Sequence, residues 1–186
     1  EIEHKILLVD GKVPPSTCRN IVAVAMLAEE LEWTADFLLS FQKHLDKTTF
    51  AFNLATVRFH QQEYEAVLPL LAATKYKDVL LRLGVKALQL KNFYELYMKH
   101  EIDFQYEDEL DLYLQSFAVF LKRNSKILTK NVVYYENLIA FVKQIFIIKQ
   151  DVEVDKMAWQ ELYETIEKCV EVAEKSWLVE KVGRLF

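Results

Sequence analysis

Glycine and proline are scarce in this sequence, with three of each among 186 residues. Folds that cradle phosphate in glycine-rich loops, and sandwiches of many short strands, need more of both residues for their turns. Cysteine is equally rare, and Cys18 and Cys169 lie far apart without a paired spacing. We interpret them as reduced thiols, which are typical of a cytoplasmic protein. These shortages favour helices over strands.

Long hydrophobic runs and excess positive charge are also missing. The longest apolar run is IVAVAMLA, residues 21–28, whereas a membrane-spanning helix needs about 20 residues. The net charge is −5, which disfavours nucleic acid as a partner. We therefore expect neither a membrane nor a nucleic-acid partner. The chain begins EIEHKILLVDG rather than with Met, so we expect a piece of a longer protein.

Apolar residues at helical spacing are abundant. They make up 52% of the chain, against 27% charged residues, which is a foldable balance. Trp33, Phe37, Phe41 and Leu45 recur at every fourth position, as on one face of a helix. The pattern predicts an all-α protein with helices at about residues 17–29, 31–45, 48–61, 63–73, 76–99, 106–123, 129–149, 154–174 and 176–185.

A weak internal repeat links two of these helices. NLATVRFHQQEY (53–64) aligns with RLGVKALQLKNF (82–93), so that Ala55 meets Gly84. A fainter copy lies upstream of the first at a similar offset. A small residue inside a helix lets a neighbouring helix approach to about 8 Å. We expect Ala55 and Gly84 to mark such contacts, with the aromatic Tyr64 folded back into the gap.

These residues resemble the tetratricopeptide repeat. Leu54-Ala55, Phe59 and Gln62-Glu63-Tyr64 occupy its leucine, small and aromatic positions, and Leu83-Gly84 with Phe93 repeats part of the pattern. The resemblance covers residues 17–122. It implies a right-handed stack of antiparallel helix hairpins. The chain departs from the family in its short offsets, against a usual period of about 34 residues, and in Pro69, which falls inside a predicted helix.

The wider layout is similar to bacterial helical-repeat proteins of uncharacterised role. Four segments carry this resemblance, at residues 20–37, 52–71, 120–130 and 176–186. It implies repeats over 1–123 followed by C-terminal helices over 124–186 that pack on the repeats in one continuous domain. The implied role is that of a scaffold.

Sequence motifs typical of catalysis or metal binding are not found in complete form. No G-x-S-x-G motif occurs, and the histidines (His4, His44, His60 and His100) fall on different elements. Asp151-x-Glu153-x-Asp155 resembles the start of a calcium loop, but Lys156 and Leu162 stand where that loop needs Gly and Glu. We therefore expect no enzyme activity, metal or cofactor.

Two other features leave alternatives open. The segment 101–111 is acidic, and basic residues from Lys122 to Lys130 follow it. They are either solvated helix ends or patches that steer a charged partner. The helix expected at 129–149 is apolar almost all round, so it is either buried or an association surface.

The first helix of each repeat hairpin lines the concave side, so the resemblance implies a partner-binding surface there. Its residues are Phe52, Thr56, Phe59, His60, Leu81, Val85, Leu88 and Gln89. This surface lacks the polar clamp that holds a peptide carboxylate, and the C-terminal helices could fill it.

Our leading hypothesis is a non-catalytic protein-interaction domain of the helical-repeat type, monomeric or weakly self-associating, that binds a protein or peptide. The competing hypothesis is a ligand-sensing or enzymatic helical domain whose cleft is built from unlike helices.

Overall fold

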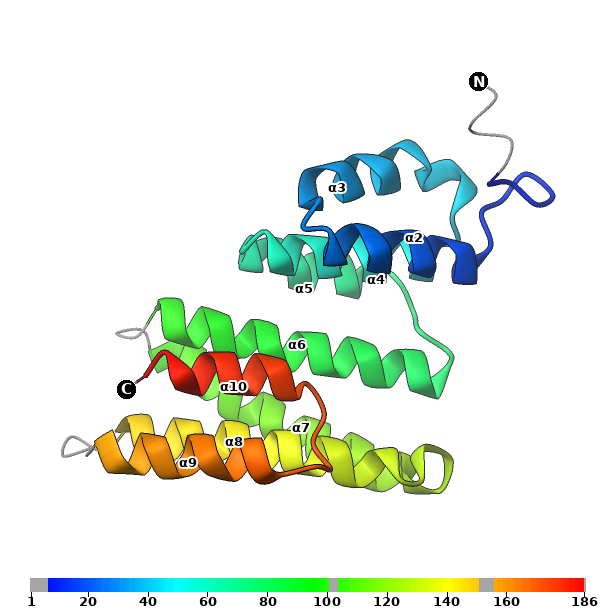
Figure 1. Cartoon of the computed structure of the whole chain (residues 1–186). Helices are drawn as coiled ribbons and strands as arrows, with labels where there is room; N and C mark the ends of the chain where they lie inside the picture. The colour runs from blue at the N-terminus through cyan, green and yellow to red at the C-terminus, as the bar shows by residue number, and fades with distance from the viewer. Residues whose placement is uncertain (1–6, 101–103, 151–155, 186) are drawn as a thin grey trace. The chain divides into compact units, whose positions relative to one another are not determined.

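The computed structural model describes residues 7–100, 104–150 and 156–185. These residues form nine α-helices and one isolated bridge between Val9 and Lys12, with no strand among them. The all-α prediction is confirmed. The helices, labelled as in Figure 1, are α2 (Pro15–Leu27), α3 (Leu31–Ser40), α4 (Lys47–His60), α5 (Tyr64–Ala72), α6 (Val79–Lys99), α7 (Phe104–Leu128), α8 (Asn131–Gln150), α9 (Lys156–Lys168) and α10 (Lys175–Gly183).

The chain divides into two compact units, residues 1–100 and 101–186. The junction expected at 123/124, between the repeats and the C-terminal helices, lies inside α7. The sequence did not indicate this long helix correctly, because its last turns are strongly basic and resemble a helix end.

In the first unit, antiparallel helix hairpins follow one another. Figure 1 shows α2, α4 and α6 running in one direction, with α3 and α5 running in the other. Helix α4 packs against α2, α3, α5 and α6, whereas α2 packs against α3 and α4. A 3₁₀ turn at Gln42–His44 links the first hairpin to the second.

The three helices that run in the same direction begin at regular positions. Helices α2, α4 and α6 start at Pro15, Lys47 and Val79, so the two intervals between successive starts are equal. Equal intervals are expected when consecutive units of one kind stack on each other.

Aspartates cap the second and third of these helices. Asp46 caps α4 by accepting hydrogen bonds from the backbone N–H groups of Thr48 and Thr49 at 3.0 and 2.9 Å. Asp78 caps α6 through the N–H of Leu81 at 2.7 Å. Such caps satisfy N–H groups that the helix leaves without partners.

The turns inside the first two hairpins share one geometry. After α2, Glu29 has a φ of 60°, and the N–H groups of this residue and the next donate to carbonyls in the last turn of α2. After α4, Gln62 has a φ of 62°, and the same two bonds recur in the last turn of α4. Both are Schellman motifs, in which Glu29 and Gln62 occupy equivalent positions.

The helix starts correct the repeat alignment. Counted from those starts, Ala55 of α4 is equivalent to Ala87 of α6 rather than to Gly84. Gly84 and Ala87 are nearly one helical turn apart, so both fall on a similar helix face. The alignment therefore paired residues of like character that are not equivalent in the fold.

Ala55 and Gly84 do lie at helix contacts, as expected. Ala55 is fully buried in an apolar cluster with Phe59 and Val67. A Cβ placed on Gly84 would lie 3.4 Å from the ring of Phe52 on α4. The neighbour of Gly84 is therefore an aromatic side chain rather than the backbone. Tyr64 folds back into the gap as expected, with its ring 5.5 Å from that of Phe59.

In the second unit, α8 packs against α7, α9 and α10. Its residues Leu138, Val142 and Ile145 are fully buried, which supports the buried alternative for this apolar helix. The link between α9 and α10 is fixed on α8 by hydrogen bonds from Ala173 N–H to the Tyr134 carbonyl and from Asn137 to the Glu171 carbonyl. Lys175 Nζ donates to two carbonyls at the end of α9.

Two smaller expectations have mixed outcomes. Pro69 lies inside α5, which has only nine residues, in agreement with a shortened helix. Asp151, Glu153 and Asp155, which depart from the calcium-loop pattern, lie outside the described residues, as do Glu101, Asp103 and His4.

Candidate functional site

The concave-face residues expected from the repeat lie on α4 and α6, but much of that surface belongs to the core. Phe59, Val85 and Leu88 are buried in one apolar cluster, and Phe52 packs against it. Thr56, Leu81 and Gln89 are half-buried, and His60 is exposed. The structure thus brings the predicted residues of the two helices together, largely as helix-packing contacts.

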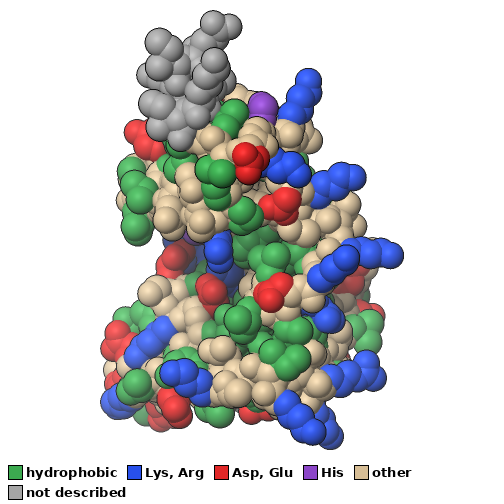
Figure 2. All heavy atoms as spheres, turned by 90° about the vertical axis from the view of Figure 1, so that its right-hand side faces the viewer, with side chains coloured by type: hydrophobic (Ala, Val, Ile, Leu, Met, Phe, Trp, Pro, Cys, Tyr) green, Lys and Arg blue, Asp and Glu red, His purple; other side chains and the backbone are tan. Residues whose placement is uncertain are grey.

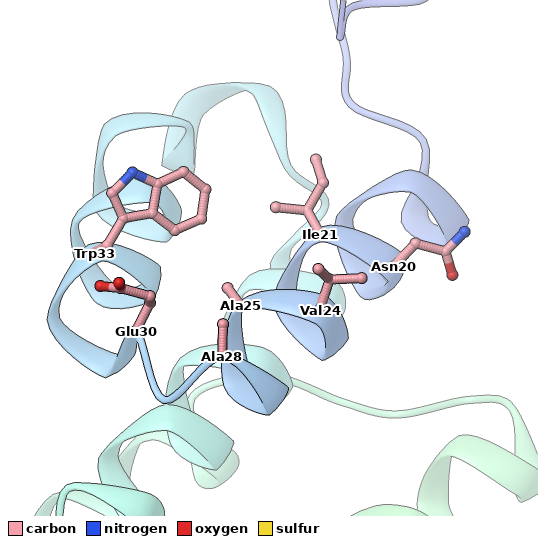
Figure 3. A pocket seen from close by; sticks show the side chains of 7 residues that line it. All are labelled: Asn20, Ile21, Val24, Ala25, Ala28, Glu30 and Trp33. Carbon is pink, nitrogen blue, oxygen red and sulfur yellow. The ribbon is translucent and has the colours of Figure 1, made fainter.

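Another surface of the first unit is open and apolar. A groove with a volume of about 670 Å³ lies between α2 and α3 (Figure 3), and its lining residues are Asn20, Ile21, Val24, Ala25, Ala28, Glu30 and Trp33. A second hollow of about 430 Å³ continues it along α3 and shares Ile21 and Trp33 with the first. We call the two together the α2–α3 groove.

Helix α2 supplies one wall of this groove because it is apolar on more than one face. Cys18, Val22 and Ala25 are buried toward the core. Val24 and Leu27 point away from it and are 67% and 86% exposed. The run IVAVAMLA therefore provides both a packing face and an accessible one. An isolated exposed valine is ordinary, but a continuous apolar hollow beside it is typical of a binding site.

Helix α3 supplies the other wall through a stack of aromatic rings. Trp33 and Phe37 lie with ring centroids 5.5 Å apart and planes at 7°, and Phe37 lies 4.9 Å from Phe41. Phe37 and Phe41 are buried, but Trp33 is 52% exposed. Figure 3 shows the indole of Trp33 across the hollow from Ile21 and Val24. A partly exposed tryptophan on a buried aromatic base resembles the anchors of protein interfaces.

The charged residues lining the groove are acidic. Glu30 lies at its α2–α3 turn end, and Asp36 lines its continuation along α3. Neither carboxylate has a hydrogen-bond or ion-pair partner among the described residues. The backbone of Glu30 is nevertheless fixed, because its carbonyl accepts a hydrogen bond of 2.6 Å from Thr34 Oγ1. Two carboxylates are thus held at the edge of an apolar surface.

Sequence reasoning missed this groove. It placed Trp33 with Phe37, Phe41 and Leu45 on one face of a helix, whereas α3 ends at Ser40 and a spacing of four residues drifts around a helix of 3.6 residues per turn. The drift carries Trp33 to the edge of the buried face. The uninterrupted apolar run of residues 21–28 was the signal that could have indicated an exposed apolar wall.

Two titratable groups elsewhere in the first unit have pKa values raised by burial. Burial raises the pKa of the Cys18 thiol to about 11, and the nearby charge of Asp46 adds to this effect. Burial likewise raises the pKa of Tyr76 to about 12. Neither group is poised to react near neutral pH. No cluster of three or more His, Cys, Asp or Glu side chains suitable for a metal occurs in the described part of the chain.

The side chain of Asn92 and the hydroxyl of Tyr76 are buried polar groups in the part of the chain that the structure describes. The side chain of Asn92 is fully buried, and neither its Nδ2 nor its Oδ1 has a hydrogen-bond partner among the described residues. The same holds for the hydroxyl of Tyr76. Such groups cost stability. Neither residue lines the α2–α3 groove.

The surface charges are mixed. On the face shown in Figure 2, Lys and Arg side chains alternate with Asp and Glu among hydrophobic and other side chains. No described helix has the length and apolar character that crossing a lipid bilayer would require. Comparison with protein-family models, curated proteins and solved structures found no match to the chain.

Proposed function

We propose that this protein is a non-catalytic interaction domain of the helical-repeat type, and that it binds a helix of another protein in the α2–α3 groove. The observation that carries the proposal is the groove itself, which is apolar, accessible and anchored by the half-exposed Trp33. Grooves of this kind accept the apolar face of an amphipathic helix through side chains at positions i, i+3, i+4 and i+7.

The regular hairpins support the helical-repeat part of the proposal. The intervals between helix starts and between equivalent turns are close to the tetratricopeptide period of about 34 residues. Stacked hairpins of this type commonly present binding surfaces. The proposal also favours a cytoplasmic location, because Cys18 and Cys169 are both free thiols.

The α2–α3 groove is a better candidate than the concave-face residues. Displacing Phe59, Val85 or Leu88 toward a partner would open an apolar cluster of the first unit. The lining of the α2–α3 groove is accessible without such a change. We therefore assign Phe59, Val85 and Leu88 a packing role and the groove a binding role.

The proposal is tested by selection from a displayed library of helical peptides. Selected peptides are then titrated into the wild-type chain and the variant V24D, in which a carboxylate enters the apolar wall. V133D is the matched control, because Val133 is an exposed valine on α8, in the other unit. We expect V24D to weaken binding at least about tenfold and V133D to leave it unchanged.

Contradictory results are equally clear. If the library yields no binder, or if its binders tolerate V24D as well as V133D, the α2–α3 groove is not the binding site. Circular dichroism of both variants establishes that they remain folded.

A further inference from the structure

Acidic residues outnumber basic residues beside the groove. Helices α2 and α3 with their connecting turn contain a single basic residue, Arg19, against the acidic residues Glu29, Glu30, Glu32 and Asp36. Of these acids, Glu30 and Asp36 line the groove itself. Among the described residues, no lysine or arginine lines either hollow. An occupant of the groove therefore meets negative charge at its apolar edge.

The dimensions suit about three turns of helix. Glu30 and Phe41, which lie near the two ends of the lining, are separated by about 16 Å along α3 at 1.5 Å per residue. Glu30 and Asp36 are separated by about 9 Å on the same scale, or nearly two turns. Two cations at positions i and i+7 of a partner helix could therefore face both carboxylates.

We infer that the occupant of the α2–α3 groove is a cationic amphipathic helix, with lysine or arginine beside its apolar stripe and about two turns apart. This inference rests on the proposed function and narrows it to one class of partner. The apolar stripe supplies the affinity, because Ile21, Val24 and Trp33 lose water on contact. The cations supply selectivity, since like charges at the same positions are repelled.

The other occupants fit the charges less well. An anionic membrane surface or an acidic helix would bring negative charge against Glu30 and Asp36. A second copy of this chain could present the exposed side of α7, where Val119 and Ile127 accompany Lys122, Arg123 and Lys126. That surface is basic, but it exposes only two large apolar residues within three turns. A separate partner helix can present a continuous apolar stripe.

Two designed peptides test the inference. Each is about 18 residues long, which supports helix formation, and carries the same leucine stripe, with either lysine or glutamate at all other positions. Binding is measured by calorimetry at low salt and again at about 0.5 M salt, where exposed charges are screened. We expect the lysine peptide to bind about tenfold more tightly than the glutamate peptide at low salt, and the preference to shrink at high salt.

Matched variants locate the source of the preference. E30Q/D36N removes the two groove carboxylates with little change of shape. E161Q/E171Q removes two exposed carboxylates from the second unit and changes the net charge equally. We expect the first variant to reduce the preference to about twofold or less and the second to retain it. V24D should weaken the lysine peptide, because the leucine stripe occupies the apolar wall.

Each other outcome overturns the inference in a recognisable way. Equal binding of both peptides, abolished by V24D, would leave the proposed function intact and remove the charge selectivity. If the preference for the lysine peptide survives E30Q/D36N, acidic residues elsewhere in the chain cause that preference. Self-association of the chain in light scattering, abolished by V24D, would make a second copy the occupant. Binding of phosphatidylcholine vesicles, abolished by V24D, would make it a lipid surface. If neither peptide binds, the inference is wrong. If the library selection also yields no binder, the proposed function is wrong as well.

Discussion

The first two hairpins of the chain have the same turn geometry, but the apolar gap is filled in one and open in the other. Both α2–α3 and α4–α5 turn through a Schellman motif, and their first helices belong to the evenly spaced series α2, α4 and α6. In α4–α5, the rings of Phe59 and Tyr64 lie in the gap and α6 packs over both helices. In α2–α3, the aromatic Trp33 remains half exposed beside an open groove.

The difference shows that hairpin geometry alone does not decide whether an apolar gap is buried in the core or exposed. Helix α4 has helices on several sides, whereas α2 packs against α3 and α4. Within the first unit, the apolar gap is filled where a further described helix covers it, and it stays open where no described helix of that unit does. A hairpin cannot bury its apolar faces by itself, which is why the proposed function assigns binding to the α2–α3 groove.

The largest predicted difference is in the free energy of unfolding when the aromatic residue of each gap is replaced. The residues are Phe59 in α4–α5 and Trp33 in α2–α3. Phe59→Ala should lower the free energy of unfolding of the first unit by about 3–5 kcal/mol, because it leaves a cavity in a packed cluster. Trp33→Ala should cost less than about 1.5 kcal/mol, since half of the side chain is already in water. Urea denaturation of both variants measures the difference. Equal losses would mean that the α2–α3 gap is packed as tightly as the other.

A second prediction tests how closely α6 packs against α4. Gly84→Leu should destabilise the chain by about 2 kcal/mol, because the added side chain overpacks against the ring of Phe52. Gly84→Ala should stabilise it by about 0.5–1 kcal/mol, since the new Cβ meets that ring at an ordinary 3.4 Å and alanine favours the helix. Thermal melts of both variants measure the pair of effects. A neutral Gly84→Leu would contradict the close approach.

A third prediction compares the equivalent caps of α4 and α6. Asp46→Ala should cost about 1–2 kcal/mol, and Asp78→Ala should lie toward about 0.5 kcal/mol, because Asp46 caps two N–H groups and bonds two threonine hydroxyls. Chemical denaturation measures both. Equal costs would show that the additional bonds of Asp46 contribute nothing.

The cap of α4 also has a pH signature. Hydrogen bonds from Thr48 and Thr49 outweigh the opposing effect of partial burial and lower the pKa of Asp46. Its contribution is therefore fully present above the unfolded pKa of about 3.9 and is lost as the pH falls through the lower folded value. Asp46→Asn should flatten the decline of stability below about pH 4. An unchanged acid slope would contradict this assignment.

The last prediction concerns Asn92 on α6. Replacing it with leucine should stabilise the chain by about 1 kcal/mol, because two buried polar atoms without partners among the described residues are removed at nearly constant volume. Glutamine at the same position is the polar control and should not stabilise. Chemical denaturation measures both variants. Destabilisation by leucine would show that the Asn92 amide has a role that the packing does not reveal.

Much of the fold could be predicted from the sequence because helical periodicity is a local signal. Each of the expected helices has a counterpart among the described residues, and the small residues Ala55 and Gly84 lie at helix contacts. Helix ends were less predictable. The prediction ended a helix at residue 123, whereas α7 continues to Leu128, because a run of basic residues suits both a helix end and a solvated helix face.

The open α2–α3 groove was far less predictable, because its exposure depends on which helix covers which. Phe59 and Trp33 both belong to apolar stripes in the sequence, yet one is 6% exposed and the other 52%. Periodicity shows that a residue lies on an apolar face but not whether another element covers that face. For the same reason, the expected concave residues Val85 and Leu88 are found in a packed cluster.

Accessibility of Trp33 to acrylamide, with and without a bound peptide, tests the central claim most directly. Replacing Trp159 and Trp177, which are 7% and 9% exposed, with phenylalanine leaves Trp33 as the only tryptophan. The account predicts strong quenching in the free chain and marked protection when a helix selected for binding is added. Fluorescence that is already protected in the free monomer, or that stays equally accessible in the complex, would contradict it.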